Sequence, residues 1–298
     1  MQLGVIFPTA EIGTDPAVIR DFAQTAEELG FAYIATYDHV VGAEHDRRDP
    51  PLDGPYTQND PFHEPVALFG YLAALTSRIR LATGIMILPQ RQTVLVAKQM
   101  AELAVLSGDR IVLGVGTGWN PVEYEALGVD FKDRGALLDE QVVLLKQLWT
   151  QSLVDFRGRF HRVDRAGILP LPSALIPIWM GGFGRRPIER ASRHADGFFF
   201  GSNIENANVL ATHLHERLLA EGREAKNFSL DLTVNIHDSP EQWHRAAAQW
   251  QGWGKRSLSL RTMGPSGLHM PGKRFAEARQ HITALESFMK EMRQHMFE

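Results

Sequence analysis

Short apolar runs alternate along this chain with longer stretches in which apolar residues recur every three or four positions. The first unit shows the pattern, because residues 3–7 form an apolar run and the next stretch carries one apolar stripe of helical spacing. Asp15 stands where a helix N-cap is expected, Pro16 takes the first helical position, and Gly30 follows the last apolar residue. These signals predict a strand followed by an amphipathic helix.

Eight units of this kind follow one another along the 298 residues. We expect strands at 3–7, 32–36, 79–88, 111–115, 178–180, 197–200, 229–236 and 257–261. Helices are expected at 16–29, 64–76, 94–107, 133–149, 187–194, 205–221, 240–250 and 273–292, and a hairpin at 153–163. This alternation fits a (β/α)8 barrel better than a doubly wound sheet. The predicted fold is α/β: one TIM-barrel domain over residues 1–298, with inserted loops at its C-terminal face.

Composition argues against several classes of function. The formal net charge is −4, with 44% hydrophobic and 22% charged residues, so the basic character of a nucleic-acid-binding protein is missing. No apolar run approaches the roughly 20 residues of a membrane helix, and the first residues lack the pattern of a secretory signal. The chain has no cysteine, which excludes disulfides and thiolate chemistry. We therefore expect a cytoplasmic protein that binds neither nucleic acid nor membrane.

The C-terminal ends of the strands are where a barrel carries its active site. Asp38 and His39 follow the second predicted strand and open the long polar stretch 41–62. Most histidines are structural or solvated, but this position favours a general acid or base, because imidazole titrates near neutral pH. Asp38 would then orient the ring or bind the ligand. His39 is our candidate catalytic residue.

Two more strands carry glycine near their ends. Thr83, Gly84 and Ile85 lie inside the third predicted strand, where a glycine indicates a bulge, a close backbone approach or simple packing. The fourth strand runs into the turn VGTGW at residues 115–119, where Trp119 looks exposed. Glycines there either turn the chain or let a ligand approach the backbone. The pattern alone leaves both readings open.

The fifth predicted strand ends in the segment MGGFGRR. Gly181, Gly182 and Gly184 lead into a helix, so free backbone donors and a positive helix end would meet an anion there. Arg185 and Arg186 add positive charge. The segment is neither a GxGxxG dinucleotide motif nor a Walker motif. It indicates a phosphate-bearing cofactor, or else a tight turn with two solvated arginines.

Four segments, taken together, resemble the luciferase-like flavin and deazaflavin oxidoreductases. They are ELGFAYIATYDHV, IRLATGIMILPQR, VLGVGTGWNPVEYEALG and PIWMGGFGRRPIERASRHADGFF, in the family's order within residues 1–200. The resemblance implies a (β/α)8 barrel that holds FMN or coenzyme F-420 at its C-terminal mouth, as a homodimer. It also implies that Asp38 contacts the cofactor, that His39 moves a proton, and that the peptide between Gly84 and Ile85 is cis.

The same resemblance implies a set of cofactor-binding residues at these strand ends: Asp38, His39, Thr83, Gly84, Ile85, Thr117, Gly118, Trp119, Met180, Gly181, Gly182 and Arg185. Residues 117–119 would line the ring and ribityl chain, and residues 180–182 would approach the phosphate. Similar sugar-phosphate dehydrogenases carry a glutamate where Trp119 stands, so we expect this chain to act on another substrate. Proton transfer then rests on His39, on water or on Glu123.

The YDH and GTGWNP sequences resemble the deazaflavin branch more than the FMN branch. We therefore expect an oxidoreductase that transfers hydride between coenzyme F-420 and a small organic substrate. That substrate would bind over the cofactor beneath residues 41–62, with 263–272 as a second cover. The alternatives are an FMN-dependent monooxygenase, a barrel that binds flavin without turnover and, more weakly, a metal-dependent hydrolase, although no HxH motif follows the first strand and no metal is expected.

Overall fold

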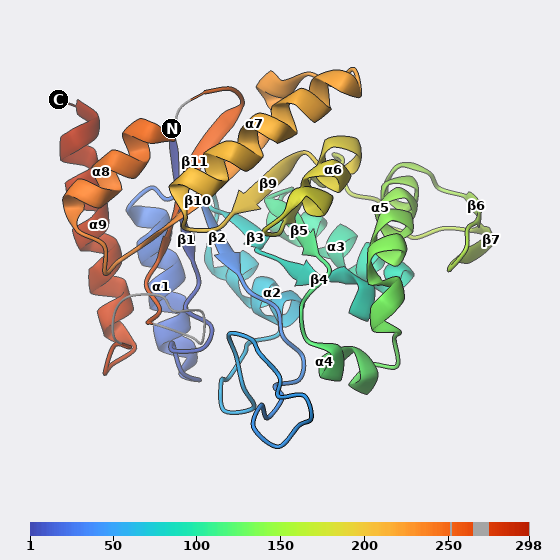
Figure 1. The fold of residues 1–298 in the computed structure, drawn as a ribbon, viewed down its shortest axis with the longest axis horizontal. Coiled ribbons are helices and arrows are strands. Elements are labelled where there is room, and N and C mark those ends of the chain that lie inside the picture. The colour runs from blue at the N-terminus through green and yellow to red at the C-terminus, as the bar shows by residue number, and fades with distance from the viewer. Residues whose placement is uncertain (251, 265–273, 298) are drawn as a thin grey trace.

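Parallel strands form a closed barrel in the computed structural model, which describes residues 1–298 except 251, 265–273 and 298 (Figure 1). The strand order is β3-β2-β1-β11-β10-β9-β8-β5-β4, and β3 also pairs with β5, which closes the ring. Since β3 and β4 both pair with β5 and share one position, these nine strands fill eight positions. The strands are β1 (Gln2–Ile6), β2 (Tyr33–Thr36), β3 (Arg80–Thr83), β4 (Met86–Ile87), β5 (Ile111–Gly116), β8 (Ile178–Gly181), β9 (Gly197–Phe200), β10 (Ser229–Asn235) and β11 (Lys255–Arg261).

Helices surround the barrel and alternate with its strands along the chain (Figure 1). The Asp15 carboxylate accepts a hydrogen bond from the N–H of Ala17 at 2.9 Å, and Gly30 has a φ of +83°, so the predicted signals at both ends of the first helix are confirmed. The helices are α1 (Pro16–Glu28), α2 (Pro65–Leu75), α3 (Thr93–Ser107), α4 (Pro121–Ala126), α5 (Arg134–Thr150), α6 (Arg185–His194), α7 (Ile204–Ala220), α8 (Pro240–Gln249) and α9 (Arg279–Phe297).

The predicted TIM-barrel fold is confirmed, and its strands and helices fall close to their expected ranges. The strand expected at 79–88 is divided into β3 and β4, which are separated by Gly84 and Ile85. The peptide between these two residues is cis, as the family resemblance implies. The start of the helix expected at 273–292 lies outside the described residues, and α9 begins at Arg279.

The short helix α4 is not among the predicted elements. Asn120 caps it by accepting from the N–H of Val122 at 3.0 Å, and Pro121 takes the first helical position. These start signals stand in the sequence, but a helix of six residues is too short to show an apolar period. This helix matters because it carries Glu123 into the site.

Two segments project from the barrel. The predicted hairpin is present as β6 (Val154–Arg157) and β7 (Arg162–Ala166), an antiparallel pair that extends sideways beyond α5 (Figure 1). Residues 41–62 form an irregular loop that lies beside α4, drawn in blue in Figure 1. Across the described part of the chain, no helix combines the length and the apolar character needed to cross a bilayer.

Candidate active site

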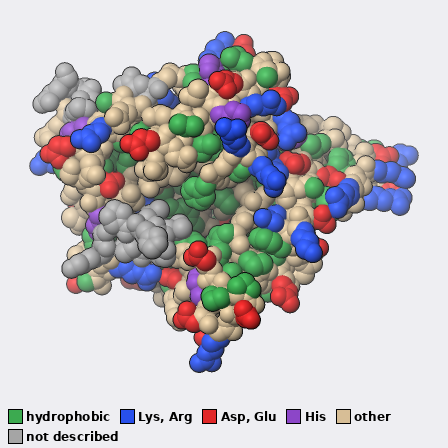
Figure 2. Space-filling view, viewed as in Figure 1, with side chains coloured by type: hydrophobic (Ala, Val, Ile, Leu, Met, Phe, Trp, Pro, Cys, Tyr) green, Lys and Arg blue, Asp and Glu red, His purple; other side chains and the backbone are tan. Residues whose placement is uncertain are grey.

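A cavity of about 630 Å³ opens at the C-terminal ends of the strands. Its volume lies within the range of small-molecule sites. Figure 2 shows a hollow lined by hydrophobic side chains near the middle of the molecular face.

The wall formed by β3, β5, β8 and β9 is rich in glycine at the level of the cavity. Four glycines at or just after the ends of these strands line the cavity, namely Gly84, Gly116, Gly181 and Gly201, together with Phe199 of β9. A Cβ atom at Gly116 would lie 2.5 Å from Cδ1 of Ile85, and one at Gly181 would lie 2.9 Å from its Cγ2. The glycines therefore leave room for the Ile85 side chain, which covers this wall and gives it a flat apolar surface.

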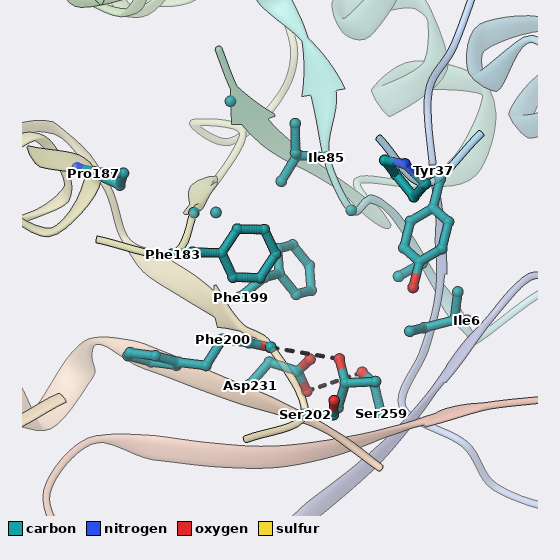
Figure 3. A pocket seen from close by; sticks show the side chains of 18 of the residues that line it. Ile6, Tyr37, Ile85, Phe183, Pro187, Phe199, Phe200, Ser202, Asp231 and Ser259 are labelled. Carbon is teal, nitrogen blue, oxygen red and sulfur yellow. Dashed lines mark hydrogen bonds between the residues drawn. The ribbon is translucent and has the colours of Figure 1, made fainter. Parts of the chain in front are cut away.

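The opposite wall, on β10 and β11, is polar. Asp231, Thr233, Ser259 and Arg261 line the cavity there, and in Figure 3 Asp231 and Ser259 lie across the rings of Phe199 and Phe183 from Ile85. None of these residues is among those predicted from the sequence to form the site. A signal was present, because polar residues alternate with Leu and Val in SLDLTVN and with Leu in SLSLR. In a barrel strand this period of two places the polar set inside and the apolar set against the helices.

Asp231 is the most deeply buried acid of this wall. Its Oδ1 accepts hydrogen bonds from the hydroxyls of Ser257 at 2.8 Å and Ser259 at 2.9 Å, and also from Tyr33. Burial raises the pKa of Asp231 to about 6, although these three hydroxyl donors lower it in part. The folded protein therefore holds this proton at a pH where an exposed aspartate has lost it.

We expect the free energy of unfolding of Asp231→Asn, compared with that of the wild type, to be higher at pH 8 than at pH 4. The unfolded chain releases the proton near pH 3.8 and the folded chain near pH 6, so the ionised carboxylate lowers folding stability as the pH rises between these values. The gap corresponds to about 2–3 kcal/mol. Urea unfolding of both proteins at pH 4 and pH 8 measures it. An unfolding free-energy difference that does not change with pH would contradict the raised pKa.

His39 lies at the mouth of the cavity and is held by a buried carboxylate. Its Nδ1 is 3.2 Å from Oε2 of Glu123, and the Glu123 side chain is 0% exposed. Three rings pack around the imidazole, with centroid distances of 5.3 Å to Tyr56, 4.9 Å to Phe62 and 6.0 Å to Trp119. With Nδ1 directed at Glu123, Nε2 is the ring nitrogen that can exchange a proton with a bound molecule.

Glu123 is itself fixed by other donors. Its Oε1 accepts from the backbone N–H groups of Val40 at 2.5 Å and Val41 at 3.1 Å, and its Oε2 accepts from Nε2 of Gln90 at 3.1 Å. Burial alone would raise the pKa of Glu123, but the contact with His39 and these backbone donors lower it overall. Glu123 is thus an ionised acceptor that sets the orientation of His39.

Asp38 does not orient His39, so that part of the sequence prediction is wrong. Its carboxylate pairs with Arg91, at 2.8 Å from Oδ1 to Nη2, and its Oδ2 accepts from the N–H of Ile87 at 3.0 Å. The Asp38 side chain is 1% exposed and that of Arg91 is 15% exposed. Asp38 lines the cavity, but its oxygens are directed at β4 and Arg91, and they fix the end of β2 to the next strand position.

Trp119 is not the exposed residue that the sequence suggested. Its ring lies beneath the loop 41–62, because a Cβ at Gly54 would come within 2.0 Å of Cζ3 of the indole. The imidazole of His45 packs on it with a centroid distance of 6.0 Å. From the same loop, Tyr56 lines the cavity and is 9% exposed. The loop therefore covers the mouth of the cavity with aromatic side chains, while the predicted cover at 263–272 lies largely outside the described residues.

Comparison with known proteins identifies the family. A family model described as luciferase-like monooxygenase matches residues 1–296. The chain belongs to this family. It is therefore an oxidoreductase of the luciferase-like type, and the resemblance inferred from the four sequence segments is confirmed.

The relatives of this luciferase-like chain differ in cofactor. It is 36% identical over 199 residues to an uncharacterized protein of Mycobacterium tuberculosis, covering 65% of this chain and 69% of that one. It is 30% identical to an F420-dependent glucose-6-phosphate dehydrogenase of Kineococcus radiotolerans, covering 86% and 73%. It is 28% identical to an FMNH2-dependent dimethylsulfone monooxygenase of Pseudomonas fluorescens, covering 77% and 60%. Family membership thus leaves F-420 and FMN as two choices.

A solved structure supports the fold. The monooxygenase RslO1 from Streptomyces bottropensis superposes with a TM-score of 0.79 at 18% sequence identity, covering 99% of this chain and 100% of that one. At this identity the likeness shows the fold alone. The luciferase-like barrel is therefore common to both proteins.

The residues predicted to bind the cofactor divide into two groups. Those that line the cavity are Asp38, His39, Gly84, Ile85, Thr117, Gly118, Trp119, Gly181 and Gly182. The others are Thr83, Met180 and Arg185. Thr83 is 0% exposed and donates to the carbonyl of Gly114, Met180 packs in the hydrophobic core, and Arg185 is exposed at the start of α6. The structure thus brings the glycine turns together with His39 and leaves those three outside the lining.

The start of α6 faces the same cavity. Gly182, Phe183 and Pro187 line it, and Gly184 caps α6 without a side-chain hydrogen bond. The first N–H groups of this helix therefore lack a side-chain acceptor. Asn203 and Asn206, at the start of α7, also line the cavity and are not among the predicted site residues. This end of the cavity is polar and suited to an anion.

Proposed function

We propose that this protein transfers hydride between coenzyme F-420 and a small organic substrate. The observation that carries the proposal is the contact between Nδ1 of His39 and the buried carboxylate of Glu123 at the mouth of the cavity. A histidine held in this way can supply or remove the proton that accompanies hydride transfer. The YDH and GTGWNP sequences support the deazaflavin over FMN, as does the similarity to the F420-dependent dehydrogenase of Kineococcus radiotolerans.

The cavity fits a flavin-like ring with a phosphate tail. Its volume of about 630 Å³ can hold a ring system and a small molecule together. The glycine wall with Ile85 offers a flat apolar surface to one face of a ring. The uncapped start of α6, preceded by Gly182, offers backbone N–H groups to a phosphate. Gly84, Gly116, Gly181 and Gly182 would therefore hold the cofactor.

His39 and the side chains that contact it have distinct parts in proton transfer. When bound, a reduced deazaflavin supplies a hydride and reacts poorly with oxygen. His39 exchanges a proton through Nε2, and Glu123 stabilises the positively charged ring that results. Tyr56 and Trp119 shield His39 from water, which strengthens the attraction between the ring and Glu123.

The cofactor kept by the protein tests this proposal. We expect protein purified from a host that makes both cofactors to retain the deazaflavin, identified by mass and absorbance of the released molecule. Retained FMN would overturn the assignment and favour the monooxygenase alternative. Retained deazaflavin that no carbonyl, imine or enone reoxidises would favour a barrel that binds without turnover.

Gly182→Ala should weaken cofactor binding about tenfold. Gly182 has a φ of +154°, and an added Cβ would lie 2.6 Å from Cγ of Pro187, so the start of α6 must move. Gly184→Ala is the matched control, because its φ is −149° and nothing lies within 4 Å of the added Cβ. Equilibrium titration with F-420 gives both dissociation constants. Equal affinities for the two variants would contradict a phosphate site at this turn.

The substrate, the homodimer and the cytoplasmic location stay predictions. The substrate is a small organic molecule that binds under the loop 41–62, next to His39. Within the described residues no group of three His, Asp or Glu side chains converges as metal ligands, and His63 instead lies 2.9 Å through Nε2 from the carbonyl of Gly13. We therefore propose no metal.

A further inference from the structure

The polar wall of the cavity holds a carboxylate that the proposed proton transfer does not use. Asp231 is 1% exposed and lines the cavity. Its Oδ1 accepts from three hydroxyls, whereas its Oδ2 is buried without a hydrogen-bond partner in the part of the chain that the structure describes. A buried acceptor without a donor is unfavourable, so its presence in a cavity indicates a donor on a molecule that binds there.

The surroundings of Asp231 make it selective. Ile6, Phe199 and Phe200 line the cavity around it with apolar surface (Figure 3). The hydroxyls of Ser257 and Ser259, at 2.8 and 2.9 Å, fix the carboxylate before any ligand arrives. Thr233 and Arg261 share the polar wall, and Asp231 is its carboxylate. A few oriented polar groups next to apolar surface are the usual arrangement by which a pocket sets specificity.

We propose that Oδ2 of Asp231 accepts a hydrogen bond from an O–H or N–H group of the substrate, which is otherwise apolar. This inference rests on the proposed function only in taking the cavity as the substrate site. It assigns to the substrate a hydroxyl or amine group on an otherwise apolar body, and it disfavours molecules that present only a carbonyl or carboxylate oxygen to Asp231. Asp231 is then a specificity-determining residue, distinct from the proton-exchanging His39.

A matched pair of probes tests this. 1-(2-naphthyl)ethanol and 2-acetonaphthone differ in one group, a hydroxyl donor against a carbonyl acceptor. Each is titrated by fluorescence into the protein, first alone and then with the protein saturated with the form of F-420 that cannot react with it, reduced for the alcohol and oxidised for the ketone. The titrations use pH 8, because the carboxylate with a pKa of about 6 is then ionised. We expect the wild type to bind the alcohol at least tenfold more tightly than the ketone, with and without F-420.

Asp231→Asn keeps the shape of the side chain and replaces the free oxygen by an amide donor, so the preference should vanish or reverse. Ser202→Ala is the control, because Ser202 lines the same cavity and is exposed, and it should leave the preference unchanged. An equal affinity of the wild type for both probes would overturn the inference. This measurement uses the wild type alone, so it does not depend on whether a variant folds. A preference that disappears once F-420 is bound would overturn the assignment to substrate. Neither titration involves turnover, so either result is independent of a failure of hydride transfer.

Discussion

Replacing His39 with alanine is expected to lower the rate of hydride transfer about 10²–10⁴-fold, the usual contribution of a positioned general acid or base. The imidazole contacts the buried Glu123 through Nδ1, so Nε2 meets the cavity in a fixed orientation. Alanine leaves the glycine wall and the start of α6 unchanged, so affinity for the cofactor should change little. Single-turnover reoxidation of bound reduced F-420 by an accepted substrate measures the rate.

Two companion variants separate catalysis from packing. Glu123→Gln places an amide where an acceptor for the His39 ring stood, so we expect a smaller loss of about tenfold through disturbed orientation of the ring. His63→Ala removes a nearby histidine that packs on Phe7 and does not line the cavity, and the rate should stay within twofold of wild type. A His39→Ala protein that keeps the full rate would remove His39 from the mechanism.

Asp38→Ala is expected to lower the free energy of unfolding by about 3–5 kcal/mol. The change leaves the half-buried guanidinium of Arg91 without the carboxylate 2.8 Å away and leaves the N–H of Ile87 without its acceptor. Arg91 then keeps the exposed Glu64 as an ion-pair partner, and the loss arises mainly because its charge is less well compensated and the N–H of Ile87 stays buried without an acceptor. Urea unfolding at pH 7 gives the value.

Glu64→Gln is the matched control for this effect. Glu64 pairs with the same Arg91 at 3.0 Å, but its side chain is 45% exposed, so removing its charge should cost less than about 1 kcal/mol. Glutamine can still accept from the N–H of Ala67 and cap α2. Similar losses for the two variants would contradict a dominant structural role of Asp38 at the end of β2.

The barrel could be predicted from the sequence because its signals are local. Asp15, Pro16 and Gly30 mark one helix within a short stretch, and each strand is a short run of apolar residues. Two features that produce no local apolar period were not predicted. The helix α4 is too short to show a period, and the division of the third strand at Gly84 cannot be recognised from apolar pattern alone.

Residues of the site could be predicted only where they follow the end of a predicted strand. Glycine turns and His39 were found in this way, and the structure places them around one cavity. The pairing of Asp38 with Arg91 could not be predicted, because Arg91 lies 53 residues further along the chain and the two meet only in the closed barrel. Asp231 was missed because a polar residue inside an apolar strand was treated as part of that strand, although its alternation with leucines marks it as inward-facing.

The oxygen dependence of cofactor reoxidation tests the central claim most directly. Protein loaded with reduced F-420 is mixed with a panel of carbonyls, imines and enones, with and without oxygen, and the cofactor absorbance is followed. The account predicts that one class of organic acceptor reoxidises the cofactor at the same rate under both conditions. Reoxidation that requires oxygen, or none with any acceptor, would contradict hydride transfer as the function of this protein.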